Sequence, residues 1–138
     1  MIVSFTGENK FLSNFFPCDI GPFPSVENAY VAAKLKGTHP ILLTCSPGKA
    51  KRYGREHELV PEWSNEVHRV NIMRQLLHVK FSHVPLKNAL LATGEVLIVE
   101  GNTWNDTFWG QCPIGNGKNW LGNILMEIRD ELSGKAFF

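Results

Sequence analysis

The sequence has few cysteines, and their arrangement builds no structural site. Cys18, Cys45 and Cys112 are far apart and odd in number. A disulfide framework uses an even count of cysteines, and a zinc site usually contains a C-x-x-C pair. We therefore expect reduced thiols and, because thiols stay reduced in the cytosol, a cytoplasmic protein.

Long apolar runs are also absent. No stretch reaches about 18 apolar residues, which excludes a membrane-spanning helix. Residues 1–11 contain no basic stretch followed by a long apolar segment, so we expect no signal peptide. Nothing in the sequence indicates a membrane partner or an obligate protein partner.

Neither sign of charge dominates. The chain has 14 lysines and arginines against 13 acidic residues, a net charge of +1. Tight non-specific binding to nucleic acid needs a denser basic surface than this. One basic cluster stands out within residues 49–55, made of Lys49, Lys51, Arg52 and Arg55. It is either a solvated helix face or a grip for a substrate phosphate.

Several familiar catalytic motifs are missing. The sequence contains no G-x-x-x-x-G-K-[ST] loop, no G-x-G-x-x-G fingerprint and no G-x-S-x-G elbow. His57 and Glu58 are not followed by the second histidine of a zinc-protease helix. We expect no metal site and no cofactor.

The length fits one domain over residues 1–138, since compact domains mostly run from about 100 to 200 residues. Apolar spacing and capping signals predict helices at residues 26–36, 47–53, 64–81, 86–92 and 120–133. Ser25, Ser46 and Asn119 are the predicted N-caps. Strands are predicted at residues 2–5, 10–12 and 96–99, the last of them buried. Helices dominate, so we expect a compact α+β fold, mostly helical, with a small β-sheet.

The first predicted helix carries three polar residues on one face. Glu27, Tyr30 and Lys34 follow each other at i, i+3 and i+7. Glu27 and Lys34 are about 10 Å apart along the helix, too far for a direct salt bridge, but a substrate between them can touch both. The alternative is that Glu27 only favours the helix N-terminus and Lys34 is solvated.

The loop after the last predicted strand is rich in aromatic and acidic residues. Residues 100–110 contain Glu100, Trp104, Asp106 and Trp109. Loops at strand ends commonly carry functional sites. Aromatic faces can hold a base, and a carboxylate can stabilise an oxocarbenium ion. The alternative is that the rings only cover the core.

Two further segments have weaker signals. Residues 115–119 form a glycine-rich turn before the last helix, and such a turn offers backbone N–H groups to an anion. Residues 11–17, Phe-Leu-Ser-Asn-Phe-Phe-Pro, lie next to a predicted strand. They are either an apolar loop that plugs the core, with turn hydrogen bonds from Ser13 and Asn14, or part of a site.

Taken in order, these segments resemble the NADAR (YbiA-like) family over nearly the whole chain. The resemblance is carried by FLSNFFP, PSVENAYVAAK, a helix ending in VKF, LLATGEVLIVE, DTFWG and GNGKNWLGNILMEIRDEL. It implies a largely helical α+β fold and an enzyme that hydrolyses the bond between ribose and a nitrogen. The implied substrates are ribosylamino-pyrimidine intermediates of riboflavin synthesis, or ADP-ribose attached to guanine in nucleic acid.

The resemblance places the catalytic residues at Glu27, Lys34 and Asp106. Together with the segments above it nominates as substrate-binding residues Ser13, Asn14, Phe15, Tyr30, Trp104, Trp109, Gly110, Lys118 and Asn119. The chain departs from the family where residues 111–114, Gln-Cys-Pro-Ile, precede Gly115. A differently shaped loop there weakens the case for anion binding by the turn.

Two chemical routes are compatible with these residues. Glu27 can stabilise a ribosyl cation during direct hydrolysis. Alternatively, Lys34 can attack C1′ of an opened sugar and form a Schiff base, if burial depresses its pKa. We expect one cleft to gather Asn14, Glu27, Lys34, Asp106 and Trp109. Phe15 or Trp109 is expected to stack on the base. The competing class is a non-catalytic module that binds ADP-ribose or a nucleotide.

Overall fold

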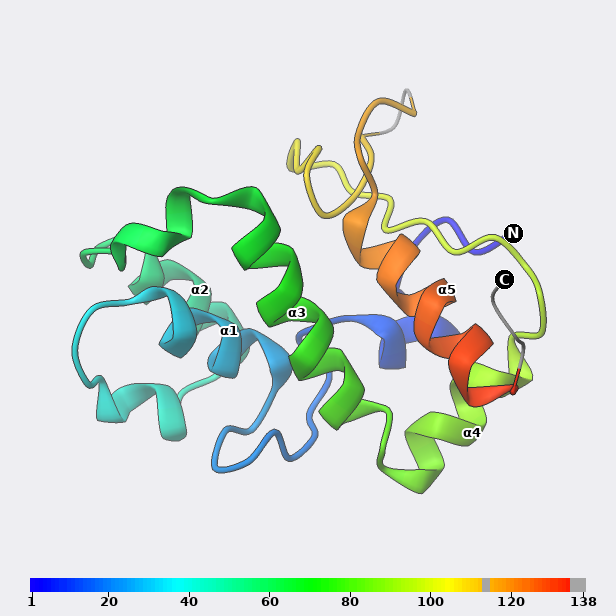
Figure 1. Ribbon diagram of the computed structural model, residues 1–138, viewed down its shortest axis with the longest axis horizontal. Coiled ribbons are helices and arrows are strands. Elements are labelled where there is room, and N and C mark those ends of the chain that lie inside the picture. Colours follow the sequence, from blue (N-terminus) through cyan, green and yellow to red (C-terminus); the bar gives the residue numbers. More distant parts are fainter. Residues whose placement is uncertain (113–114, 135–138) are drawn as a thin grey trace. The chain divides into compact units, whose positions relative to one another are not determined.

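The computed structural model describes residues 1–112 and 115–134 (Figure 1). These residues form the α-helices α1 (Val26–Lys34), α2 (Pro47–Gly54), α3 (Glu66–Lys80), α4 (Val84–Ala92) and α5 (Trp120–Leu132). They also form the 3₁₀ helices η1 (Gly7–Leu12), η2 (Pro40–Leu43) and η3 (Pro61–Ser64). The predicted, mostly helical class is confirmed.

Strand pairing in the described residues consists of isolated bridges: Ile2 with Ile98, Ile20 with Phe23, Leu35 with Leu59, and Gly101 with Gln111. The small β-sheet therefore stays a prediction. The strand predicted at residues 10–12 is wrong, because these residues close η1, where Ser13 N–H donates to the Lys10 carbonyl at 3.0 Å.

The segment at residues 96–99 is less buried than predicted. Ile98 is fully buried, but Val96 and Leu97 are 39% and 49% exposed. Ile98 pairs with Ile2 in a single parallel bridge and is the one fully buried residue of this segment. The continuous apolar run does not make a continuous buried strand here.

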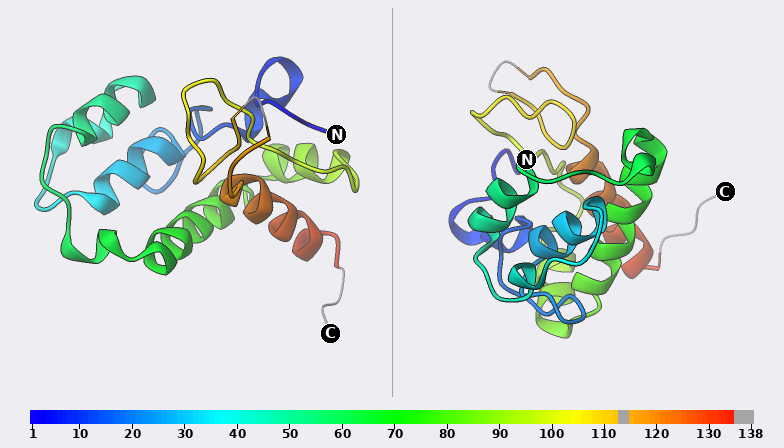
Figure 2. Two further views of the ribbon diagram at one scale, coloured as in Figure 1. Left: turned by 90° about the horizontal axis from the view of Figure 1, so that it is seen from above. Right: turned by 90° about the vertical axis from the view of Figure 1, so that its left-hand side faces the viewer.

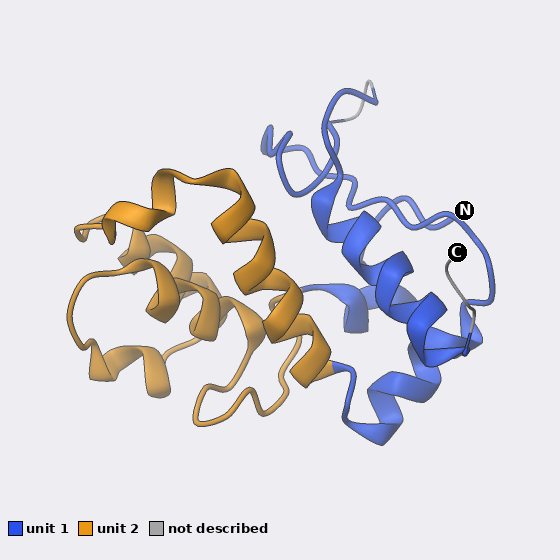
Figure 3. Cartoon of the chain, in the orientation of Figure 1, with its two compact units in different colours: residues 1–13, 81–138 blue, residues 14–80 orange. Residues whose placement is uncertain are grey.

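The chain divides into two compact units (Figure 3). Unit 1 consists of residues 1–13 and 81–138, and unit 2 of residues 14–80. The single domain over residues 1–138 stays a prediction. None of the described helices is long and apolar enough to cross a membrane.

Unit 2 is built around α1, which packs against α2 and α3 (Figures 1 and 2). Ser25 and Ser46 cap α1 and α2 as predicted, because their side chains accept the backbone N–H of Asn28 and Lys49. Between α1 and α2 lies an apolar cluster of Val31, Leu35, Leu42 and Ala50. Helix α3 adds the buried Val70, Met73 and Leu77.

Unit 1 contains α4, which packs against α5 and η1. The predicted apolar stripe of α5 is buried at Leu121, Ile124, Leu125 and Ile128. Asn119 is the N-cap residue of α5, as predicted, but its side chain does not cap the helix. Asn119 has a positive φ of 51° and makes no side-chain cap hydrogen bond, because its amide binds other parts of unit 1.

Candidate active site

Two residues at the start of α1, Ser25 and Asn28, have structural roles. Ser25 Oγ accepts Asn28 N–H at 3.1 Å. The buried Asn28 Nδ2 donates to the carbonyls of Leu42 and Cys45, each at 2.9 Å, which ties α1 to η2 and to the segment before α2. Ser25 and Asn28 therefore hold the helix in place, while Glu27 between them makes neither of these bonds.

Glu27 lies in the first turn of α1 and is half-buried. Its backbone N–H donates to the Asn14 carbonyl at 3.0 Å, so residues 14–16 run past the beginning of the helix. The Asn14 amide is oriented by Met73 of α3, whose sulfur accepts from Nδ2 at 3.6 Å. These contacts place Asn14 beside Glu27, and their shared role in a cleft stays a prediction.

Lys34 is the last residue of α1, on the same face as Glu27. Burial lowers the pKa of its ammonium group from the usual value, while the charge of Glu27 raises it and the charges of Arg55 and Lys51 lower it further. The Tyr30 ring, one turn earlier, lies with its centroid 5.8 Å from Lys34 Nζ. The amine is thus partly desolvated, with charges of both signs around it.

Helix α2 carries the basic cluster of Lys49, Lys51, Arg52 and Arg55 on and just after it. Lys51 is half-buried, and its Nζ lies 5.9 Å from the centroid of the Phe15 ring. The Phe15 side chain is 40% exposed. Because Lys51 and Arg55 act on the pKa of Lys34, these two residues and the amine belong to one electrostatic neighbourhood within unit 2.

Two residues of this neighbourhood were missed from the sequence. Trp63 in η3 packs edge-on against Tyr30, with ring centroids 5.1 Å apart, and both rings are buried. At Gly54, the end of α2, an added Cβ atom would crowd the Lys34 side chain. Both residues depend on contacts between separate helices, which leave no signal in the local sequence.

The remaining predicted residues lie in unit 1. The Asp106 carboxylate closes a turn, because Oδ1 accepts the backbone N–H groups of Phe108 and Trp109 at 3.1 and 2.9 Å. Asn102 Oδ1 accepts Asp106 N–H at 2.9 Å, and Asn102 Nδ2 donates to Glu100 Oε2 at 3.0 Å. This network shapes the loop at residues 100–110, and the catalytic role of Asp106 stays a prediction.

Gly110 and Asn119 also have clear structural tasks. A Cβ atom at Gly110 would overlap the Glu100 carboxylate and carbonyl, so a side chain does not fit there. Asn119 Nδ2 donates to the Ile98 carbonyl at 3.0 Å, and its Oδ1 accepts Glu100 N–H at 2.9 Å. These bonds fix the loop to the start of α5.

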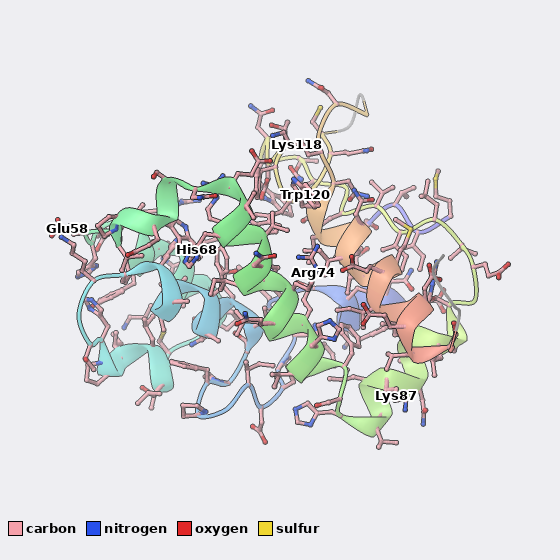
Figure 4. The ribbon with its side chains drawn as sticks, in the orientation of Figure 1. Glu58, His68, Arg74, Lys87, Lys118 and Trp120 are labelled. Atoms are coloured by element: carbon pink, nitrogen blue, oxygen red, sulfur yellow. The ribbon has the colours of Figure 1, made fainter. Side chains whose placement is uncertain are left out.

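Among the predicted site residues of unit 1, the exposed side chains are Trp104, which is 59% exposed, and Lys118. Figure 4 shows Lys118 where the loop meets α5. Its Nζ lies 5.7 Å from the centroid of the Phe108 ring. Trp109 is half-buried and packs edge-on against Phe108, and Ser13 follows η1 in the same unit.

The predicted site residues thus form two sets. Unit 2 contains Asn14, Phe15, Glu27, Tyr30 and Lys34, and unit 1 contains Ser13, Trp104, Asp106, Trp109, Gly110, Lys118 and Asn119. A single cleft for both sets stays a prediction. Pro113 and Ile114, in the loop that departs from the family, lie outside the described residues. Within residues 1–112 and 115–134, no group of three or more His, Cys, Asp or Glu side chains is placed to hold a metal ion.

Comparison with known proteins agrees with the resemblance stated above. Residues 4–133 match the sequence profile of the NADAR domain family. The N-glycosidase YbiA of Escherichia coli is 36% identical over 115 residues, which cover 80% of this chain and 71% of that protein.

Two longer relatives carry a different name. A riboflavin biosynthesis protein of Vibrio vulnificus is 36% identical over 137 residues, covering 91% of this chain and 36% of that protein. A chloroplastic riboflavin biosynthesis protein of Zea mays is 36% identical over 132 residues, covering 84% of this chain and 21% of that protein. The chain therefore corresponds to a minor part of these two relatives.

Proposed function

The chain belongs to the NADAR family, and on this premise we propose that it hydrolyses the bond between ribose and a nitrogen in a phosphorylated ribosyl compound. It is then a hydrolase acting on N-glycosyl bonds. The observation that carries the proposal is the partly buried amine of Lys34, with its lowered pKa, on the same helix face as Glu27. An amine that loses its proton more easily is a better nucleophile near neutral pH.

The substrate is either a ribosylamino-pyrimidine intermediate of riboflavin synthesis or ADP-ribose attached to guanine. The names of the Vibrio and maize relatives favour the first class. Both classes attach the ribose through a nitrogen that can push its lone pair toward C1′ and open the sugar ring. This common chemistry makes a shared site plausible for either one.

Lys34 has a defined task in the Schiff-base route. When the ring opens, C1′ forms an iminium with the leaving nitrogen, and the neutral Lys34 amine adds to C1′. The leaving nitrogen takes up a proton and departs, which leaves C1′ bound to Lys34 as a Schiff base. Water then adds to C1′ and releases the sugar as an aldehyde, so the amine is restored.

Glu27 serves either route. Its carboxylate can carry the proton that Lys34 loses to the departing nitrogen. In direct hydrolysis the same carboxylate stabilises the positive charge that develops on the ribose. Its position seven residues before Lys34 on α1 allows a substrate to lie against both side chains.

Lys51 of α2 and Arg55 just after it bind the substrate phosphate. Lys51 and Arg55 are the two whose charges reach Lys34, so a phosphate beside them keeps the sugar close to the amine. The exposed ring of Phe15, next to Lys51, offers a surface on which the base stacks. Trp109 and Asp106 remain candidate contributors from unit 1.

A panel of both substrate classes tests the proposal. The purified chain is incubated with each compound, and the free base and sugar are measured by mass spectrometry, with the Lys34→Ala variant as a control. Release of base that depends on Lys34 is the expected result. If a compound binds and stays intact, the chain is a non-catalytic reader of ribosyl compounds.

A further inference from the structure

Gly54, the last residue of α2, leaves no room for a side chain beside the end of Lys34. A Cβ atom placed on Gly54 would lie 3.0 Å from Lys34 Cε and 3.4 Å from Lys34 Nζ. It would also lie 2.9 Å from Val31 Cγ1. The residue has helical backbone and is buried, so it is the space beside it that requires a glycine.

The other glycine of α2 provides the comparison. A Cβ atom at Gly48 would have its nearest neighbours at 3.7 Å, in the Arg52 guanidinium, and at 4.0 Å, in the Phe15 ring. These are ordinary van der Waals distances, so an alanine fits at Gly48. Only at Gly54 does α2 come close enough to α1 to exclude a methyl group.

This close approach decides what surrounds the Lys34 amine. Because a methyl group at Gly54 would already crowd Cε, the backbone of α2 passes close to this end of the lysine and limits the hydration of that side of the group. Lost hydration disfavours the ammonium form, and burial is the main cause of the lowered pKa of Lys34. The charged groups that also act on it are Glu27 from α1, and Lys51 and Arg55 from α2 and its end.

We propose that Gly54 is a positioning residue for Lys34, which lets α2 cover the amine and hold it in a partly dehydrated slot against α1. Where it concerns turnover, this inference rests on the function proposed above. Where it concerns the protonation of Lys34, it rests on the close packing at Gly54 and on the burial of the amine, and is independent of the proposed function.

The methyl group added by Gly54→Ala meets two neighbours, the side chains of Val31 and Lys34. Val31 is fully buried and its β-branched side chain is stiff, so it has little freedom to move. The Lys34 contacts involve the far end of a flexible chain, which can swing toward water. Alanine is also a better helix former than glycine, so α2 itself is not weakened.

The direct test is a titration of Lys34 by NMR with ¹³C-labelled lysine. The Lys34 signal is assigned by its loss in Lys34→Gln, and wild type, Gly54→Ala and Gly48→Ala are compared. We expect the pKa of Lys34 to rise in Gly54→Ala and to stay unchanged in Gly48→Ala. An unchanged pKa of Lys34 in a folded Gly54→Ala variant overturns the proposal.

The pH profile of turnover gives a second reading. At a fixed pH below the pKa of Lys34, each unit by which the substitution raises this pKa lowers the fraction of neutral amine about tenfold, and kcat falls with it. At high pH the rates of Gly54→Ala and wild type should converge, with KM little changed. A uniform loss of kcat at every pH would instead indicate general damage to the site and would contradict the positioning role.

Two controls keep the outcome clear. If Gly54→Ala does not fold, the double variant Val31→Ala, Gly54→Ala relieves the stiff contact but keeps the clash with Lys34, so the same rise of its pKa is expected. If the pKa of Lys34 rises in Gly54→Ala while wild type hydrolyses none of the ribosyl compounds, the positioning inference holds and the proposed function fails.

Discussion

Lys34 Nζ lies 5.8 Å from the centroid of the Tyr30 ring, one turn earlier on α1. The negative face of an aromatic ring attracts a cation, so Tyr30 favours the ammonium form of Lys34. Burial works in the opposite direction and lowers its pKa. The contact with Tyr30 therefore holds the amine in position, while burial makes it lose its proton more readily.

The first prediction concerns Lys34→Ala. In a Schiff-base route this variant loses nearly all turnover, because no amine remains to attack C1′. In direct hydrolysis it mainly raises KM. Borohydride treatment during turnover separates the routes, since reduction fixes the sugar on Lys34 in the first route only, and the adduct is located by peptide mass spectrometry. Wild-type kcat in Lys34→Ala, without an adduct in wild type, removes Lys34 from the mechanism.

The second prediction concerns Glu27→Gln. Glutamine keeps the shape of the side chain but removes the negative charge. Losing one such electrostatic element costs about 10²–10³ in kcat, or roughly 3–4 kcal/mol. Substrate binding should persist, because Lys51, Arg55 and Phe15 are unchanged. Single-turnover kinetics and calorimetric binding measure the two quantities separately, and a loss of binding with unchanged kcat would contradict a chemical role for Glu27.

The helices were predictable because their signals are local. Ser25 and Ser46 precede α1 and α2, and Pro47 occupies the first position of α2. Asn119 shows the limit of this reasoning. It stands where a cap is expected, but its side chain binds Ile98 and Glu100, which are about twenty residues away in the sequence. A tertiary partner overrides the local preference there.

The site was predictable in part for the same reason. Helical spacing places Glu27, Tyr30 and Lys34 on one face without any knowledge of the fold. What lies against that face depends on how two helices pack. The contact between Gly54 and Lys34, and the edge-on packing of Trp63 on Tyr30, are set by the distance between elements that the sequence does not state.

The third prediction concerns Lys51→Ala. Lys51 lowers the pKa of Lys34, so removing its charge raises that pKa and shifts the acid limb of the kcat profile to higher pH. It also removes a phosphate contact, so kcat/KM should fall for a phosphorylated substrate and change little for its dephosphorylated form. The exposed Lys49 on the same helix is the matched control. Equal effects of Lys49→Ala and Lys51→Ala would indicate only a loss of overall charge.

A second lysine with an unusual setting lies at the other end of unit 2. Lys80, the last residue of α3, is fully buried, and its Nζ lies 5.8 Å from the centroid of the Phe16 ring. Burial lowers the pKa of Lys80 to about 8, against the partial opposition of Cys18. In turn, burial raises the pKa of the Cys18 thiol, while the charge of Lys80 lowers it. We expect Lys80 to affect the free energy of unfolding rather than the proposed reaction.

The last prediction follows from the sign of that shift. An unfolded lysine titrates near pH 10.4, so between about pH 8 and 10.4 the unfolded chain binds more protons, and the free energy of unfolding rises with pH by up to about 3 kcal/mol. Cys18 contributes with the opposite sign, so Cys18→Ser is the background. Urea unfolding at pH 7.5 and 10 should show this rise in Cys18→Ser and lose it in Cys18→Ser, Lys80→Met. Parallel pH dependences in the two proteins would show that Lys80 keeps an ordinary pKa, because methionine fills the same space but carries no proton to lose.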